Sequence, residues 1–323
     1  MTGRELVRRA IEFDRPDRLP FFQHVYPQAP DDVCDSWELD RQKSGWFFDT
    51  PMPDDWGCIW EVTDVKNMGQ VAEGPLEDWS ALDTYRPPDP TDPFYFARVE
   101  NEIAAAGDRY VCLTSHFNLI ERLHMLHGFE RTMVDFYYEP EKIERVLDMV
   151  LDFKLRQVDE IHRRFGDRVD GVFLTDDWGT QTGTFISPQL FDHFFLERYR
   201  TLVSRYHEHG YHFILHSCGR INDFVDRFID AGVDVMNMQQ PRASPKTSTI
   251  RHRWRDMTRA RSSKAGSRGD PPAARKSPMW RKLHGWSNAP RPTLIPAHPV
   301  RSNMALAASG VVTSRLPITG MPG

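Results

Sequence analysis

A histidine and a cysteine, His216 and Cys218, stand two residues apart in the segment HFILHSCG (212–219). The apolar run before them predicts a buried strand, and residues two apart on a strand point to the same face. Imidazole nitrogen and thiolate sulfur are ligands that Zn²⁺ accepts, although a zinc site needs at least one further protein ligand. A strand-end histidine held by a hydrogen bond is the structural alternative, so the pair alone leaves both roles open.

Two adjacent acids, Asp176 and Asp177, follow another apolar run in DGVFLTDDWG (170–179). Neighbouring residues on a strand point to opposite faces, so we expect one carboxylate to enter a site and the other to cap a loop or orient a neighbour. The carboxylate that enters could act as a general acid or base, or as an orienting group. Turn-forming acids before Gly179 are the structural alternative.

Polar side chains follow five expected strands in the same way, at the point where each apolar run ends. They are His24, Ser115 and His116, Asp176 and Asp177, His216 and Cys218, and Asn237 and Gln239. The carboxyl ends of parallel barrel strands meet at one edge, so we expect a convergent site there, with separate loop caps as the alternative. The two aspartates are then the catalytic candidates, and the expected substrate-binding residues are His24, His116, Gln181, Asn237 and Gln239.

The first 241 residues alternate short β-like runs with helical stretches, which is the pattern of a parallel α/β fold. Strands are expected over 18–25, 110–117, 170–179, 212–219 and 233–240, and a hairpin or extended excursion over 57–74. Helices are expected over 2–13, 139–166, 188–209 and 221–231. Strands that alternate with helices of this length favour a doubly wound sheet or a barrel.

The composition indicates the cellular compartment in which we expect the protein to lie. No run approaches the roughly 18 apolar residues that span a bilayer, and the first residues lack the apolar core of a signal peptide. The four cysteines are few and scattered, which fits reduced thiols better than a disulfide scaffold. We therefore expect a cytoplasmic protein that acts on a small-molecule substrate and has no membrane segment.

The charge of the chain is divided unevenly between two parts. Residues 1–241 hold 25 Lys and Arg against 44 Asp and Glu, whereas residues 242–323 hold 16 against 2. The second part is crowded with Arg, Pro, Ser and Ala and has no sustained period of 2 or 3.6 residues. Three interpretations stay open: a frame-shifted stretch, a solvated disordered tail, and a basic arm for nucleic acid, which is the least favoured.

Two parts of the chain resemble the uroporphyrinogen decarboxylase superfamily, which includes the methylcobamide methyltransferases. They are the opening TGRELVRRAIEFDRPDRLPF and the block 170–241, with its motifs DDWGTQ, ISPQLF, HSCG and GVDVMN. The resemblance implies a (β/α)8 TIM-type barrel, with about five of its eight βα units in residues 1–241 and the barrel incomplete at its C-terminal end. It stops at Pro241, which leaves 242–323 as a basic tail.

In the methyltransferases of this superfamily, a His-x-Cys pair and a later cysteine hold a zinc ion that activates a thiol. The resemblance therefore implies His216 and Cys218 as zinc ligands, although no cysteine follows Cys218 in this chain. The implied reaction is methyl transfer from a corrinoid or methylated donor to a thiol. A corrinoid carried by a partner protein is one such donor.

Two alternatives to methyl transfer stay open. Uroporphyrinogen decarboxylases bind the propionates of their substrate with an arginine-rich segment after the first strand, as bidentate carboxylate recognition requires. The matching stretch FFQHVYPQAPDD (21–32) has no arginine, so decarboxylation of a porphyrinogen-like polyacid is the second choice. A truncated, non-catalytic product is the alternative of another class, because a barrel that lacks strands has open sheet edges.

Overall fold

The computed structural model describes residues 1–21, 31–36, 39, 52–61 and 69–238, and every statement about structure below concerns these residues. Three sequence predictions lie outside the described residues. They concern the expected substrate-binding residues His24 and Gln239 and the basic tail 242–323.

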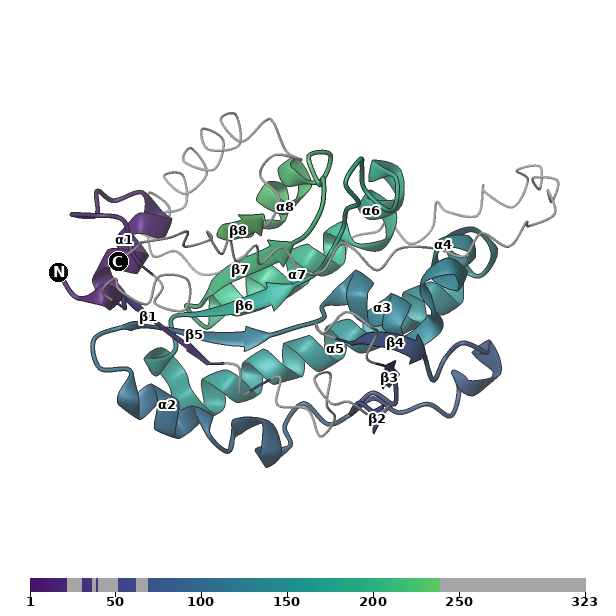
Figure 1. The fold of residues 1–323 in the computed structure, drawn as a ribbon, viewed down its shortest axis with the longest axis horizontal. Helices are drawn as coiled ribbons and strands as arrows, with labels where there is room; N and C mark the ends of the chain where they lie inside the picture. Colours follow the sequence, from purple (N-terminus) through teal and green to yellow (C-terminus); the bar gives the residue numbers. More distant parts are fainter. Residues whose placement is uncertain (22–30, 37–38, 40–51, 62–68, 239–323) are drawn as a thin grey trace, which may run out of the picture.

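Five parallel strands form the main sheet, in the order β1-β5-β6-β7-β8 (Figure 1). They run over Val33–Ser36, Tyr110–Ser115, Gly171–Thr175, His212–Ser217 and Val235–Met238. The order follows the chain in one direction and never reverses, which distinguishes a barrel-type sheet from a doubly wound one. The fold is therefore α/β of the (β/α)8-barrel type, and the described residues contribute five of its strands.

Eight α-helices accompany the sheet in the described residues, together with short 3-10 turns. The helices are α1 (Gly3–Glu12), α2 (Val99–Ala105), α3 (Leu119–His127), α4 (Phe129–Tyr138), α5 (Pro140–Phe165), α6 (Pro188–Phe194), α7 (Leu196–Glu208) and α8 (Val225–Ala231). The turns are η2 (Trp79–Ala81), η3 (Pro93–Phe96) and η4 (Gly166–Arg168). The helix expected over 188–209 is present as α6 and α7, with a break at Phe195.

Helix α5 follows from its sequence. Pro140 begins it, where the N–H that proline lacks would have no partner within the helix, and Gly166 follows its end with a φ of 53°. Its apolar residues recur every three to four positions, so they form one face that is buried against α3 and α7. The expected helix over 139–166 is confirmed almost to the residue.

A smaller antiparallel sheet joins β2 (Met52–Pro53), β3 (Ile59–Glu61) and β4 (Gln70–Glu73) and lies beside α3 (Figure 1). The β3–β4 pair confirms the expected hairpin. Asp54 organises the turn before β3, because its carboxylate accepts the N–H groups of Trp56 and Cys58 and the indole N–H of Trp60.

The first strand expected over 18–25 is wrong in its described part, because residues 18–21 form no strand. The first strand of the main sheet is β1, which begins at Val33. Arg18 donates two hydrogen bonds of 2.6 and 2.7 Å to the carboxylate of Asp32, and the N–H of Phe21 donates to the same carboxylate. These polar contacts hold the segment as a loop against the start of β1.

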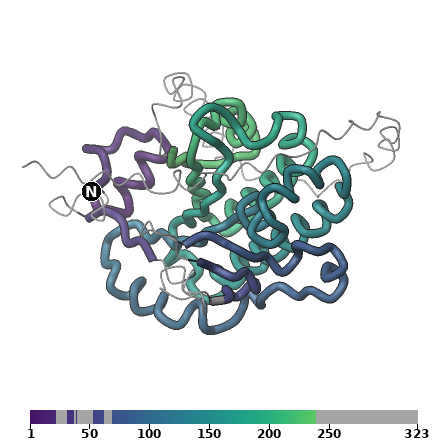
Figure 2. Tube along the Cα trace, turned by 45° about the vertical axis from the view of Figure 1, so that its right-hand side comes forward, coloured from purple at the N-terminus to yellow at the C-terminus, as the bar shows by residue number. Residues whose placement is uncertain are grey.

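Helix α1 lies at the amino ends of the strands, at one end of the molecule in Figures 1 and 2. Thr2 caps it by accepting the N–H of Glu5, as the sequence predicts. Arg4 and Arg8 both donate to the buried carboxylate of Asp170, which stands just before β6. The helix therefore closes the edge of the sheet opposite to the one where a site is expected.

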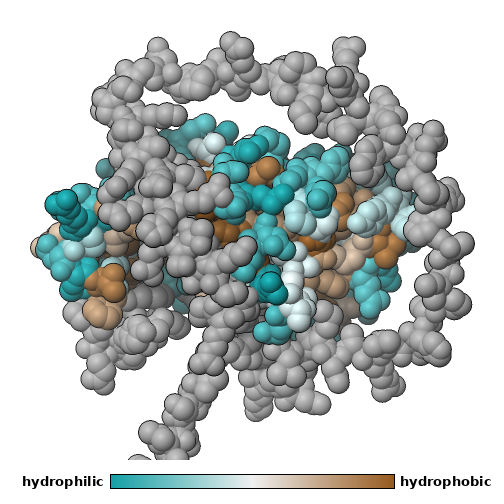
Figure 3. Space-filling view, turned by 90° about the horizontal axis from the view of Figure 1, so that it is seen from above, coloured by the Kyte–Doolittle hydropathy of each residue, from teal (hydrophilic) through white to brown (hydrophobic). Residues whose placement is uncertain are grey.

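One large cluster of buried apolar side chains joins the sheet to its helices. The face seen in Figure 3 has hydrophobic side chains between hydrophilic ones. The last described strand, β8, keeps Val235, Met236 and Met238 half-buried. Within the part of the chain that the structure describes, no helix has the length and apolar character to cross a membrane.

Candidate metal centre

Three neighbouring strands, β6, β7 and β8, bring polar side chains to the carboxyl edge of the main sheet. Thr175 at the end of β6 pairs with His216 of β7, and His216 pairs with Asn237 of β8. Asp177 follows β6 closely, and Cys218 directly follows β7. Because the strands are parallel, these residues meet at the edge where barrel enzymes hold their sites.

Asp177, His216 and Cys218, here called the donor triad, each place one ligand atom within 4.8 Å of the others. His216 Nε2 lies 3.4 Å from Cys218 Sγ and 3.8 Å from Asp177 Oδ1. Zinc bonds of about 2.0–2.3 Å at tetrahedral angles separate neighbouring ligand atoms by roughly 3.3–3.6 Å. The His216–Cys218 separation lies in this range and the His216–Asp177 separation slightly above it, so the donor types and these spacings are compatible with a zinc ion that keeps one position for a further ligand.

The loops that carry the donor triad hold each other through their backbones. The N–H of Arg220 donates to the carbonyl of Thr180 at 2.7 Å. Gly219 has a φ of 79°, and a Cβ at this position would lie 2.1 Å from the carbonyl oxygen of Gly179. Glycine at position 219 thus permits both the left-handed backbone and the close approach of the two loops.

Trp178, the neighbour of Asp177, anchors the β6 loop in the core. Its indole is fully buried and packs edge-on against Phe195 and Phe224, with ring centroids 4.7 and 5.4 Å away. Its backbone N–H donates to Ser217 Oγ at 3.1 Å, which ties the loop to the end of β7. The adjacent Asp177 carboxylate accepts the N–H of Cys218 at 2.7 Å, which directs it towards the end of β7.

Asp176 belongs to the core and not to the donor triad. Its buried carboxylate accepts the N–H groups of Ile120 and Glu121 at 3.3 and 2.9 Å, and the hydroxyl of Tyr199. Burial raises the pKa of Asp176 to about 7, against the opposing effect of the Tyr199 hydrogen bond. Asp176 therefore caps the start of α3 while Asp177 enters the site, which is the division that strand alternation predicts.

Acidic groups crowd around the donor triad. Glu121 of α3 is buried, and its Oε2 accepts the hydroxyl of Thr175 at 2.7 Å. Burial, followed by the carboxylates of Asp177 and Asp176, raises the pKa of Glu121 well above its usual value. Burial and Asp177 also raise the pKa of the Cys218 thiol. A bound cation would offset this gathering of negative charge.

The remaining described residues that were expected to bind substrate lie in three different places. Asn237 Oδ1 lies 2.9 Å from His216 Nδ1, so Asn237 contacts the donor triad. Gln181 is exposed in the loop after β6. His116 lines a separate pocket beside the end of β5. The structure therefore brings one of these three residues to the donor triad.

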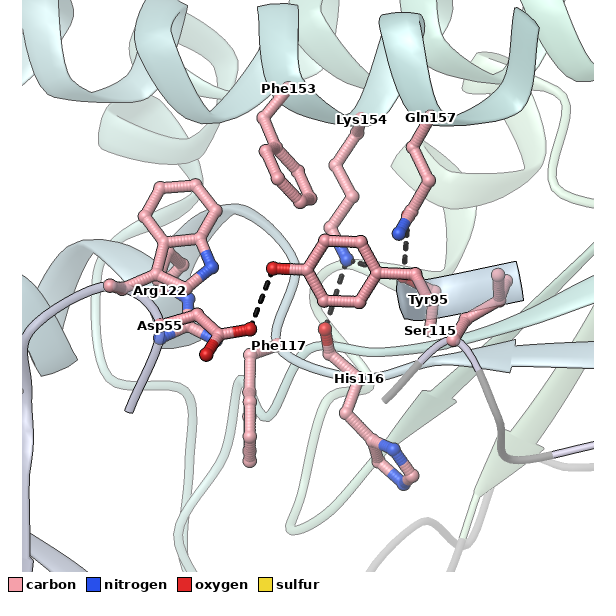
Figure 4. A pocket seen from close by; sticks show the side chains of 11 residues that line it. Asp55, Tyr95, Ser115, His116, Phe117, Arg122, Phe153, Lys154 and Gln157 are labelled. Carbon is pink, nitrogen blue, oxygen red and sulfur yellow. Dashed lines mark hydrogen bonds between the residues drawn. The ribbon is translucent and has the colours of Figure 1, made fainter. Parts of the chain in front are cut away.

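The pocket beside β5 is open to solvent, and the empty space in and in front of it measures about 340 Å³. Figure 4 shows the side chains around it, which are Leu39, Asp55, Trp56, Tyr95, Ser115, His116, Phe117, Arg122, Phe153, Lys154 and Gln157. Buried Lys154 donates to Ser115 Oγ at 2.8 Å and to the carbonyl of His116 at 2.9 Å. Ser115 in turn donates to Gln157, so α5 is tied to the end of β5 by a polar chain.

Arg122 is the second buried cation of this pocket. It donates to Asp54 at 3.0 Å, and its guanidinium lies over the rings of Trp56 and Phe117 at 4.7 and 5.2 Å. Its Nε is buried without a hydrogen-bond partner among the described residues. The ion pair with Asp54 therefore connects α3 to the small sheet.

Sequence reasoning missed three buried charged residues in this region, namely Glu121, Arg122 and Lys154. Lys154 carries a usable signal, because it stands four residues after Val150 and four before Val158, on the apolar face of α5. A charge at such a position needs a polar partner inside the fold. The other two residues give no comparable signal, because α3 is buried on nearly all sides.

Comparison with known proteins assigns the chain to a family. The family model described as uroporphyrinogen decarboxylase (URO-D) matches residues 60–253, which is more than half of the chain. The search of curated proteins found no match to this chain. A solved methyltransferase from Methanosarcina mazei is similar over 63% of this chain and 58% of its own, with 15% identity and a TM-score of 0.49. The chain thus spans less than two thirds of that structure, and so distant a likeness carries no argument about activity. By the family match over residues 60–253, the chain belongs to the uroporphyrinogen decarboxylase family.

Proposed function

We propose that this chain is an enzyme that binds zinc at the donor triad and transfers a methyl group from a corrinoid or methylated donor to a thiol. The observation that carries the proposal is the convergence of three ligand atoms of suitable type within 4.8 Å of one another. Nitrogen, thiolate sulfur and carboxylate oxygen are the protein ligands that zinc accepts.

Asp177 would supply the third ligand, which the superfamily resemblance assigns to a later cysteine. A carboxylate and a thiolate each carry one negative charge, so the exchange leaves the formal charge of the ligand set unchanged. Neutral His216 with two anionic ligands balances the charge of a divalent ion. A fourth position would then be available for the sulfur of the substrate.

Zinc would supply one piece of chemistry, the lowering of the pKa of the substrate thiol so that a thiolate forms near neutral pH. The sulfur then forms a bond to the methyl carbon, and the bond between that carbon and the donor breaks. Its electron pair stays on the donor, and the proton of the thiol passes to water. Within the chain, His216, Cys218 and Asp177 would hold the metal that binds the reacting sulfur, and the buried Trp178 packs in the core next to Asp177.

Decarboxylation of a porphyrinogen-like polyacid is the second candidate, and the family match is the observation in its favour. This reaction needs no metal, because a carboxylate can stabilise the protonated pyrrole intermediate. The two candidates therefore differ in their dependence on zinc.

Demethylation of methylcobalamin by a small thiol such as 2-mercaptoethanol, followed by the absorbance of the corrinoid, tests the proposal. The zinc-loaded chain should accelerate the reaction in proportion to its concentration, and Cys218→Ala should abolish the acceleration. Cys34→Ala, which removes a buried thiol of β1, is the matched control and should keep it. Carbon dioxide release from uroporphyrinogen without any methyl transfer would favour the second candidate instead.

A further inference from the structure

Both ring nitrogens of His216 face polar neighbours. Nε2 faces Cys218 and Asp177 of the donor triad, and Nδ1 lies 2.9 Å from Asn237 Oδ1. An amide oxygen only accepts hydrogen bonds, so Nδ1 must carry the hydrogen in this contact. In the neutral imidazole, the lone pair of Nε2 then faces Cys218 and Asp177, the other two members of the donor triad.

The sheet itself fixes the contact with Asn237. His216 and Asn237 are directly paired in the parallel ladder of β7 and β8, and paired residues place their side chains on the same face of a sheet. Met236 and Met238 pack against the core, so alternation turns Asn237 to the other face. The hydrogen bond to His216 is the one that the side chain of Asn237 makes among the described residues.

We infer that Asn237 is a positioning residue, which holds His216 in the tautomer and orientation that metal binding needs. This inference rests on the zinc site proposed above. A group that holds the other nitrogen of a metal-binding histidine typically contributes 10- to 100-fold to metal affinity. A neutral amide does so without a third negative charge beside Asp177 and Cys218, which keeps the ion attractive to an anionic thiolate.

Zinc affinity of the metal-free, full-length chain, measured by competition with a chromophoric chelator, tests the inference. Asn237→Leu removes the acceptor at similar volume and should weaken zinc binding about 10- to 100-fold. Asn237→Asp keeps an acceptor oxygen and should bind zinc at least as tightly as the wild-type chain. Asn101→Leu, on the exposed face of α2, is the matched control and should leave the affinity unchanged.

A spectroscopic readout covers the case in which Asn237→Leu fails to fold. Nitrogen-15 NMR of the metal-free wild-type chain at about pH 8 should place the His216 hydrogen on Nδ1. Wild-type zinc affinity in Asn237→Leu, or a hydrogen on Nε2 in the wild-type chain, would overturn the inference. A wild-type chain that binds no zinc would contradict the proposed function instead, so the two failures are distinguishable.

Discussion

Adjacent residues of one chain can serve different purposes when a strand turns their side chains apart. Asp177 joins His216 and Cys218 at the carboxyl edge of the sheet, whereas Asp176 is sealed in the core beneath α3. Burial raises the pKa of Asp176 to about 7, and three hydrogen-bond donors surround its carboxylate. We therefore expect the two aspartates to differ in what their removal disturbs.

Alanine at each aspartate should separate stability from metal binding. Asp176→Ala leaves the N–H groups of Ile120 and Glu121 and the hydroxyl of Tyr199 without their acceptor, so the free energy of unfolding should fall by about 2–4 kcal/mol. Asp177→Ala should lose zinc and, because it removes only the acceptor of the Cys218 N–H, lower the unfolding free energy of the metal-free chain by only about 1 kcal/mol. Urea unfolding and metal analysis measure the two effects, and a zinc-free but fully stable Asp176→Ala chain would contradict the assignment.

Gly219 offers a second prediction at the scale of single residues. In Gly219→Ala, the new Cβ meets the carbonyl of Gly179 and the φ of 79° is strained, so the two loops of the donor triad must separate. We expect weaker zinc binding and a free energy of unfolding lower by roughly 1–3 kcal/mol. Gly210→Ala is the matched control, with a φ of 77° but open space around its Cβ. Equal zinc affinity in both variants would show that the loop contact does not shape the site.

At the scale of elements, charged side chains tie the helices to the sheet at defined points. Lys154 of α5 donates a hydrogen bond to Ser115 at the end of β5, and Arg122 of α3 donates to Asp54 beside the small sheet. Near its other end, α5 holds Glu160 by ion pairs with Arg163 and Arg164. The Glu160 pairs lie within α5 itself, so it is the Lys154 contact that makes the position of α5 depend on charge as well as on its apolar face.

The stability that Glu160 contributes should depend on pH. The hydrogen bond from Arg163, and then the one from Arg164, lower the pKa of Glu160 from its ordinary 4.5 to about 2. The ionised form is favoured in the folded chain, so this stability is present above about pH 4.5 and is lost as the pH falls through 2.

The variant Glu160→Gln measures this contribution. Because Arg163 is largely exposed, we expect the variant to lower the free energy of unfolding at pH 7 by about 1 kcal/mol. The difference from the wild-type chain should shrink between pH 4.5 and 3. Glu197→Gln, in an exposed pair with Arg200 on α7, is the control and should have almost no effect. A difference that grows as the pH falls would contradict the sign of the argument.

The elements that the sequence predicts well are those whose signal is local. Periodicity and the flanking Pro140 and Gly166 define α5, and apolar runs define β5, β6, β7 and β8. Strand β1 is harder to predict because its four residues carry little pattern. The segment expected to be the first strand instead contacts the start of β1 through Arg18 and Asp32, which lie apart in sequence.

The sequence predicts most residues of the donor triad, but not which aspartate joins it or which residues of neighbouring elements contact it. Strand ends and the His-x-Cys spacing indicate His216, Cys218 and one of two aspartates, but alternation alone does not say which aspartate enters. The roles of Glu121 and Asn237 depend on which strands and helices become neighbours. Those contacts arise from the register of β6, β7 and β8, which no short stretch of sequence contains.

At the scale of the whole molecule, the described residues form one side of a barrel-type fold. Its five strands run from β1 to β8, and α1 closes the edge opposite to the donor triad. The family match extends to residue 253, which is beyond Pro241, where the motif resemblance ends. The three interpretations of residues 242–323 stay predictions, because those residues lie outside the described part of the chain.

We propose that this family member holds a zinc ion through His216 of β7, Cys218 just after β7 and Asp177 of the loop after β6. Metal analysis of the purified full-length chain, with intact mass to confirm its identity, tests this claim most directly. We predict one zinc per wild-type chain, retained in Cys34→Ala and lost when His216 and Cys218 are both replaced by alanine. A zinc-supplemented wild-type chain without stoichiometric zinc, or zinc that survives the double replacement, would contradict it.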